Sequence, residues 1–309
     1  MDYNNRMVVR CCYAGMFVQA AVIYLAPVLF MPIKQQLGLT YEQLGRLVLV
    51  NFVTQVTFDL LCGALVGRIG AKRLVVAGHF LVFTGIAMFA LLPPLMQNPY
   101  NGLIIGTIIF SMGGGVLELL LSPILNAVPS ERKAQDMALL HSFFSWGHLT
   151  VILITSLAIF FVGFDNWRWI VLGWTILPFI NAFGFASVKL PPFVEEAKRM
   201  RLRTLLKKPA FVALVLSIGL AGAAEISMAQ WRSAFCEKGL GLPKIYGDLG
   251  GMCMFAVMMG IGRTWYGLKG DSIDINRVLT GCAWLTFFTY LAACLTPWPY
   301  VSLAACALS

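Results

Sequence analysis

Charged residues are scarce in this sequence. They account for 12% of the 309 residues, whereas hydrophobic residues account for 59%. The mean hydropathy of +0.79 exceeds what a water-soluble fold tolerates, because a core of this size cannot hide so many apolar side chains. A soluble globular protein is therefore excluded, and the solvent around most of the chain is predicted to be lipid.

The sequence also lacks the motifs of catalysis and of metal binding. No H-E-x-x-H or G-x-S-x-G pattern occurs, which disfavours a membrane-embedded enzyme. The eight cysteines form no C-x-x-C pair, and nearly all lie within or at the ends of apolar runs. They are interpreted as small buried hydrophobic residues, with acylation of the adjacent Cys11 and Cys12 as an alternative. We therefore predict no metal and no cofactor.

What the sequence does contain is long apolar runs separated by short polar turns. A helix of about 20 apolar residues crosses the roughly 30 Å of hydrocarbon in a bilayer. Nine complete spans are predicted, at residues 11–33, 44–67, 73–96, 102–128, 138–162, 167–188, 210–233, 246–267 and 277–296. A tenth begins near Tyr300 and is cut at Ser309. The first run has no small-residue cleavage site, so it is interpreted as a span and not as a signal peptide.

Cationic side chains cluster in alternate loops. With a cytoplasmic N-terminus, the inside loops hold 17 of the 23 Lys and Arg residues. This asymmetry predicts that the N-terminus is cytoplasmic. The longest basic stretch, residues 189–210, is interpreted as an amphipathic segment on the inner membrane surface. A nucleic-acid partner is therefore not expected.

The basic stretch separates two parts of the chain that share motifs. Residues 37–45 read LGLTYEQLG, and residues 240–250 read LGLPKIYGDLG. Residues 63–70 read GALVGRIG, and residues 263–270 read RTWYGLKG. Repetition at an offset of about 200 residues predicts two similar halves. The predicted domains are a six-helix half at 1–188, a cytoplasmic linker at 189–209 and an incomplete second half at 210–309.

The glycines and cations of residues 63–74 mark a turn between two spans. The spacing G-x-x-x-x-G-K-[ST] of a phosphate-binding loop is not met. We interpret the segment as a short cytoplasmic turn between helices that pack closely, in which glycine permits close approach and a tight reversal. The cations are expected to hold the turn on the inside of the membrane.

This turn resembles the second-to-third-span signature of the major facilitator superfamily, G-x-L-a-D-R-x-G-R-[RK]. The matching positions are Gly63, Leu65, Arg68, Gly70, Lys72 and Arg73. Gly67 replaces the signature's aspartate, which in the family helps to latch the two halves on the inside. Residues 166–174 (NWRWIVLGW) resemble the entry to the family's sixth span, and residues 138–147 (ALLHSFFSWG) resemble the fifth-span start of its fucose-permease-like branch.

The resemblance implies an all-α polytopic membrane protein with two six-helix halves and a solute cavity between them. The equivalent of the turn in the second half is Arg263, Gly267 and Gly270, so these residues and Gly63, Arg68, Gly70, Lys72 and Arg73 form the predicted cytoplasmic gating motif. Twelve spans are typical of the superfamily. The second half is therefore expected to be incomplete, because this chain is either a fragment of a carrier or the product of a truncated gene.

Ionisable side chains inside the predicted spans are candidates for function, because burying them in lipid is costly. In the fourth span, Glu118 shares one helix face with Ser111, Gly115, Ser122 and Asn126 at three- or four-residue steps. That face is expected to point inward. In the fucose-permease-like branch a glutamate of this span takes part in proton coupling, and Glu118 resembles its counterpart.

Other spans supply further polar candidates. Asn51, Gln55 and Asp59 follow at four-residue steps in the second span. The first span offers Gln19 where the branch has an aspartate, which weakens the parallel with its proton coupling. The candidates for substrate binding or proton coupling are Glu118, Glu225, Asp59, Asn51, Gln55, Gln19, Asn126 and His148. For Glu118, Glu225 and Asp59 the alternative is a structural hydrogen bond between helices, and for His148 it is a role in packing.

The predicted function is secondary active transport of a small polar solute, with a sugar as one candidate. Burial favours the protonated form of a carboxyl group and a substrate or cation favours the ionised form, so a proton gradient can drive the solute. A proton-coupled exporter of drugs or metabolites and a non-transporting remnant of a carrier remain as alternatives. The expected partners are the solute, protons and the lipid of a bacterial inner membrane, with no obligate protein partner.

Overall fold

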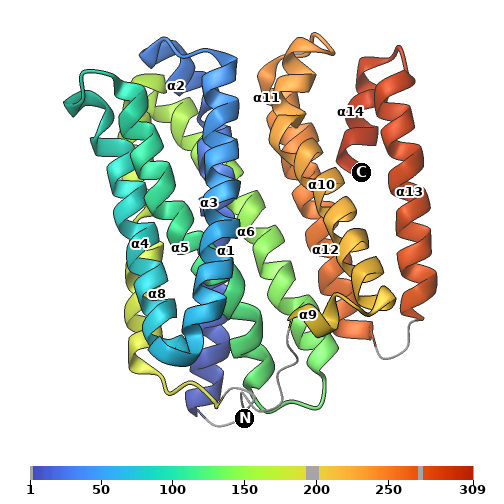
Figure 1. Cartoon of the computed structure of the whole chain (residues 1–309). Helices are drawn as coiled ribbons and strands as arrows, with labels where there is room; N and C mark the ends of the chain where they lie inside the picture. Colours follow the sequence, from blue (N-terminus) through green and yellow to red (C-terminus); the bar gives the residue numbers. More distant parts are fainter. Residues whose placement is uncertain (1–2, 193–201, 271–273, 309) are drawn as a thin grey trace. The chain divides into compact units, whose positions relative to one another are not determined.

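The computed structural model describes residues 3–192, 202–270 and 274–308, and within them the secondary structure is helical, with no strand (Figure 1). The elements are α1 (Tyr3–Val28), α2 (Phe30–Leu37), α3 (Tyr41–Ile69), α4 (Ala71–Leu91), η1 (Pro93–Leu95), α5 (Pro99–Ala127), α6 (Lys133–Val162), η2 (Phe164–Asn166), α7 (Trp167–Trp174), α8 (Ile176–Ser187), α9 (Leu202–Leu205), α10 (Pro209–Lys238), α11 (Lys244–Tyr246), the π-helical η4 (Gly247–Cys253), α12 (Met254–Lys269), α13 (Ile275–Leu295) and α14 (Pro299–Leu308).

Eight helical segments of the described chain are long and apolar enough to cross a membrane. They are α1, α3, α4, α5, α6, Phe164–Ser187, Pro209–Ala229 within α10 and Asn276–Leu295 within α13. The shorter α14 is also apolar. This pattern agrees with the predicted all-helical membrane fold.

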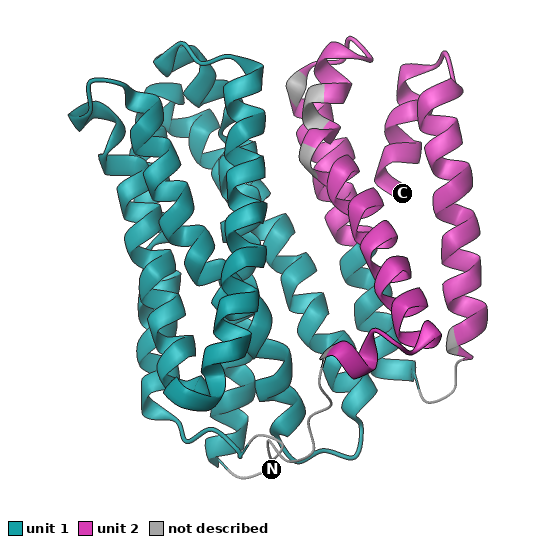
Figure 2. Ribbon diagram, viewed as in Figure 1, with its two compact units in different colours: residues 1–192, 259–270 teal, residues 193–258, 271–309 magenta. Residues whose placement is uncertain are grey.

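The residue contacts group the chain into two units (Figure 2). The first unit contains residues 1–192 and 259–270, and the second contains residues 193–258 and 271–309. In the first unit, α5 packs against α4, α3 and α1, and α1 also packs against α6. The division into a first half at 1–188 and a second at 210–309 stays a prediction.

Prolines split two of the segments that were predicted as single spans. Within the run at 11–33, α1 ends at Val28, because Pro32 has no N–H to donate to the Val28 carbonyl group. Within the run at 167–188, α7 ends at Trp174, because Pro178 has no N–H to donate to the Trp174 carbonyl group. Each of these predicted spans is therefore two helices in the structure.

The predicted span at 246–267 also differs from the structure. It is divided among α11, the seven-residue π-helix η4 and α12, which has 16 residues. Glycines 247, 250 and 251 lie in η4, and their low helix propensity permits the wider turn. A Cβ atom on Gly251 would lie 2.9 Å from Cδ of Arg232, so this turn also lies directly against a large side chain. The number of complete spans stays a prediction.

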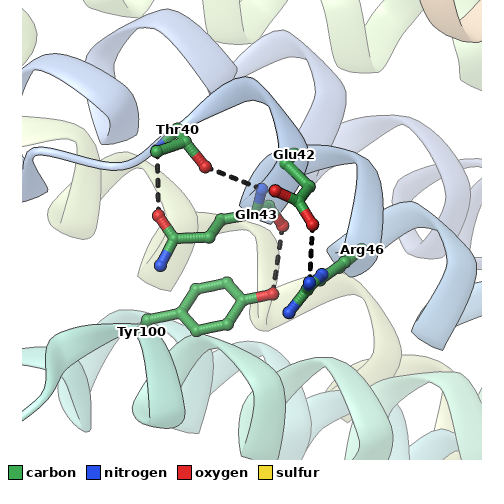
Figure 3. A network of polar contacts seen from close by, with 5 residues as sticks. All are labelled: Thr40, Glu42, Gln43, Arg46 and Tyr100. Carbon is green, nitrogen blue, oxygen red and sulfur yellow. Dashed lines mark hydrogen bonds and ion pairs between the residues drawn. The ribbon is translucent and has the colours of Figure 1, made fainter.

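The start of α3 is fixed by a network of hydrogen bonds (Figure 3). The Thr40 hydroxyl group accepts from the Gln43 backbone N–H at 3.2 Å, and the Thr40 N–H donates to Gln43 Oε1 at 2.9 Å. This reciprocal capping box satisfies two backbone donors at the helix end, and the Glu42–Arg46 ion pair follows one turn later. The Tyr100 hydroxyl group of α5 donates to the Gln43 carbonyl group at 3.1 Å, which ties the ends of α3 and α5 together.

Glycines allow α4 and α5 to pack with their backbones almost in contact. A Cβ atom on Gly85 would lie 2.1 Å from the backbone nitrogen of Phe110, and one on Gly113 would lie 2.4 Å from the Gly78 carbonyl oxygen. Such close approach is typical of helix pairs in membranes, where small residues replace a hydrophobic driving force. Because this side of α5 is held against α4, the polar side of α5 faces α3 and α1.

Candidate functional site

The backbones of α3 and α5 approach each other where α3 carries its polar side chains. A Cβ atom on Gly115 would lie 2.4 Å from the Gln55 carbonyl oxygen, and one on Gly114 would lie 3.1 Å from Gln55 Oε1. Only glycine fits at these two positions without a shift of the neighbouring helix. The glycines therefore bring α5 close enough to place Glu118 beside the amides of α3 and α1.

Asn51 and Gln55 of α3 are buried, and they form hydrogen bonds with each other and with residues of α1 and α5. Asn51 Nδ2 donates to the Val22 carbonyl group of α1 at 2.9 Å. Asn51 Oδ1 accepts from Gln55 Nε2 at 2.7 Å and from the Ser111 hydroxyl group of α5 at 2.8 Å. These bonds satisfy amide groups whose burial would otherwise be costly.

Gln19 of α1 extends these hydrogen bonds to the carboxylate. Its Nε2 atom donates to Gln55 Oε1 at 2.9 Å and to Glu118 Oε2 at 3.1 Å. Gln19 is 1% exposed, whereas Glu118 lies at the exposed end of the series. We call Asn51, Gln55, Gln19 and Glu118 the polar chain. The structure thus joins four of the predicted candidates, from three helices, into one connected group.

Two other candidates of the first unit lie outside the polar chain. Asp59 is one helical turn beyond Gln55 on α3 and is half-buried. Asn126 is exposed on α5, two turns beyond Glu118. Among the described residues, no side-chain hydrogen bond links either of them to the polar chain. They extend the polar surface around Glu118 along α3 and α5.

The two buried histidines of the first unit have different surroundings. His148 of α6 is fully buried and stacks on Tyr24 of α1, with ring centroids 3.4 Å apart and planes 4° apart. His79 of α4 lies within hydrogen-bonding distance, 2.8 Å, of both the Val75 carbonyl group and the Asn181 amide nitrogen. These contacts hold His79 between α4 and α8. His148 stays a candidate within the contact between α1 and α6.

The second unit also contains buried charged groups. Arg232 of α10 is fully buried, and its guanidinium carbon lies 4.1 Å from the ring centroid of Phe255. Asp248 of η4 is 4% exposed. Glu225, one of the predicted candidates, is half-buried on α10. Asp248 was missed in the sequence because it was interpreted as part of the repeated polar motif before a span.

The predicted gating motif is partly explained by backbone geometry. Gly70 alone separates α3 from α4, and its φ of +89° is a conformation that favours glycine. Arg68 and Arg73 are exposed and Lys72 is half-buried. The expected close approach is not found at Gly63, because a Cβ atom there would be 4.0 Å from Leu119, an ordinary contact. Gly70 therefore requires glycine in this turn, whereas Gly63 does not.

The matching motif near the end of α12 contacts α6 within the first unit. Arg263 Nη1 donates to the His141 carbonyl group at 3.2 Å and to the Ser145 hydroxyl group at 3.3 Å. A Cβ atom on Gly267 would lie 2.8 Å from Cγ of Leu139. Gly270 lies just beyond the end of α12. No carboxylate takes part in these contacts of Arg263, and a backbone carbonyl partner leaves no signal in the sequence.

Trp146 of α6 belongs to the same contact. Its indole N–H donates to the Thr264 hydroxyl group of α12 at 3.2 Å, and a Cβ atom on Gly260 would lie 3.1 Å from its ring. This bond satisfies the indole donor, as burial of a tryptophan requires. The ring is therefore held by α12, and the α6–α12 contact has both a polar and an apolar part.

Comparison with known proteins places the fold. The sequence model of the Major Facilitator Superfamily matches residues 11–309. A crystal structure of the fucose:proton symporter FucP of E. coli superposes with a TM-score of 0.73 at 15% identity, covering 97% of this chain and 80% of that one. The inward-open xylose transporter XylE of E. coli gives a TM-score of 0.64 at 13% identity, covering 99% and 80%. At these identities the likeness shows the fold alone.

A curated relative adds a shorter match. The sucrose permease of Escherichia coli is 34% identical over 84 residues, which is 26% of this chain and 20% of the permease. The matched region thus spans about a fifth of that protein's length. The family assignment rests on the sequence model, and the likeness to sugar:proton symporters rests on the solved structures.

Proposed function

The chain belongs to the Major Facilitator Superfamily and is an integral membrane transporter, and we propose that it moves a small polar solute by alternating access, driven by protons. The observation that carries the proposal is the polar chain, which ends in Glu118. Neutral amides suit a solute that is rich in hydroxyl groups, and one ionisable end suits the binding and release of a proton. The polar chain therefore favours a polar solute.

A sugar is the solute class we propose. The similar proteins are a fucose:proton symporter, a xylose transporter and a sucrose permease, which supports this class for the present chain. In this proposal Glu118 binds the proton, Gln19 and the amides of α3 form the polar wall, and Asp59, Asn126, His148 and Glu225 are further candidates for contact with the solute. The membrane we propose is a bacterial inner membrane, with the N-terminus in the cytoplasm.

The gating role of the two motifs is also a proposal. We infer that the turn at Gly70 with Arg68, Lys72 and Arg73, and the contact of Arg263 and Gly267 with α6, move when the site opens to the cytoplasm. The bonds from Arg263 to a carbonyl group and a hydroxyl group support this proposal, because they join the end of α12 that carries the motif to α6.

The test is uptake of radiolabelled fucose, xylose and sucrose into proteoliposomes with an imposed proton gradient. We expect Glu118→Gln to abolish accumulation above the external concentration and to spare exchange of labelled for unlabelled sugar, because glutamine cannot carry the proton. The matched control is Glu131→Gln, which makes the same change at an exposed position between α5 and α6. Normal accumulation by Glu118→Gln would exclude the proton-binding role, and no uptake of any of the sugars would exclude these substrates.

A further inference from the structure

The hydrogen bonds of the polar chain run in one direction, and a single backbone carbonyl group sets that direction. The Val22 carbonyl oxygen can only accept, so the Asn51 amide must place its NH2 group there. Asn51 Oδ1 must then point away from Val22, toward Gln55 and Ser111. The orientation of an asparagine amide, often ambiguous, is thus determined by its partner.

The same reasoning passes along the chain to Glu118. Because Asn51 Oδ1 faces Gln55, the Gln55 amide must present its NH2 group to Asn51 and its Oε1 atom to Gln19. Gln19 must in turn present its NH2 group to Gln55 Oε1, and the second N–H of that group donates to Glu118. The carboxylate of Glu118 therefore always finds a donor on its buried side.

We propose that Asn51 and Gln55 are positioning residues that lock Gln19 as a hydrogen-bond donor to Glu118. This inference rests on the proposed role of Glu118 in binding the proton. The fixed orientation of Gln19 favours the ionised form of Glu118, because the Gln19 N–H group donates to the Glu118 carboxylate. When Glu118 is protonated, its O–H group cannot donate to Gln19 Nε2. The O–H group can then donate to Gln19 Oε1, a buried oxygen atom with no hydrogen-bond partner in the described structure, or to an oxygen atom of the solute on the exposed side of Glu118.

The surroundings of the polar chain support a fixed orientation. A Cβ atom on Gly114 would lie 2.7 Å from Val22 Cγ1 and 3.1 Å from Gln55 Oε1. The backbone of α5 therefore packs directly against Gln55, in the middle of the polar chain. Of the described titratable groups on the helices that contact α5, Asp59 of α3 acts electrostatically on Glu118. The charge of Asp59 does not depend on how the amides are oriented, so Asp59 does not determine the orientation of Gln19.

The test measures the protonation of Glu118 directly, by infrared spectroscopy of the purified full chain in lipid nanodiscs. The carboxylic-acid C=O band of Glu118 is assigned by its loss in Glu118→Gln. At one fixed pH, we expect Gln19→Leu to raise the ratio of acid to carboxylate by about tenfold, the effect of one hydrogen bond to a charged group. Asn51→Leu should shift the ratio in the same direction by a smaller factor, because Gln55 and Gln19 are then free to rotate.

Ser111→Ala is the matched control. Ser111 also bonds to Asn51 Oδ1, but its loss leaves the bonds to Val22 and Gln55 in place, so the ratio should not change. Gln55→Leu is a second test of the lock and serves if Asn51→Leu does not fold. If Asn51→Leu and Gln55→Leu leave the ratio at the wild-type value, the positioning role is wrong. The band is measured without transport, so absence of sugar uptake would contradict the proposed function and not this inference.

Discussion

The two units of the molecule bury polar groups of different kinds. The first unit buries the neutral amides of Asn51 and Gln55, linked to a single ionisable end. The second buries a full positive charge, that of Arg232, over the ring of Phe255. Neutral amides are inexpensive to bury once bonded, whereas a guanidinium group keeps its charge at any physiological pH. We therefore propose that proton binding belongs to the first unit and that the charges of the second unit serve stability.

The largest effect is expected at the buried charge of the second unit. Arg232→Leu removes the contact with Phe255, and it removes a buried positive charge from the unit that also buries Asp248. We therefore expect a loss of about 3–5 kcal/mol in the free energy of unfolding. Thermal unfolding in detergent measures this loss. Adding Asp248→Asn should restore part of it, because Asp248 lies in η4, which packs against α10, and the double variant removes both buried charges. Fully additive losses would contradict the structural role of this pair.

A second, smaller effect is expected from the close approach of α3 and α5. Gly115→Ala would place a methyl group 2.4 Å from the Gln55 carbonyl oxygen, and we expect it to destabilise the protein by about 2–3 kcal/mol. Gly63→Ala is the control on the same helix pair, because its Cβ would meet only Leu119 at 4.0 Å. That change should be neutral or stabilising by about 0.5–1 kcal/mol, since alanine favours the helix. Equal unfolding temperatures for the two variants would contradict the packing described here.

Gly63 and Gly115 also show what a sequence can predict in this molecule. Gly63 belongs to a recognisable motif, yet its neighbourhood is open, whereas Gly115 belongs to a plain apolar run and is held against a backbone. Motif resemblance predicted the family correctly, and hydropathy predicted an all-helical membrane fold but not the breaks within the runs at 11–33, 167–188 and 246–267. Close approach depends on which helices meet, and a single sequence carries no direct signal for that.

The candidate site was predictable in its parts and not in its connections. Gln19, Gln55 and Glu118 were identified because each is a polar residue in an apolar run. The bonds among them join three helices, so they depend on the depth and rotation of each helix. The role of Val22 had no signal at all, because its backbone carbonyl group is independent of the side chain. Asp248 was missed because its motif resembles a loop.

The smallest effect on stability is predicted at Gln55, in the middle of the polar chain. Gln55→Leu removes one bond to Asn51 within α3 and one to Gln19 of α1. We assign about 0.6 kcal/mol to each bond, the value typical of side-chain hydrogen bonds between membrane helices. We therefore expect a loss of about 1 kcal/mol in the free energy of unfolding, well below that of Arg232→Leu, by the same thermal unfolding measurement. Because leucine has a similar volume, packing with Gly114 is largely kept. A loss as large as that of Arg232→Leu would mean that the amides serve stability as much as the charges do, and the contrast between the units would not hold.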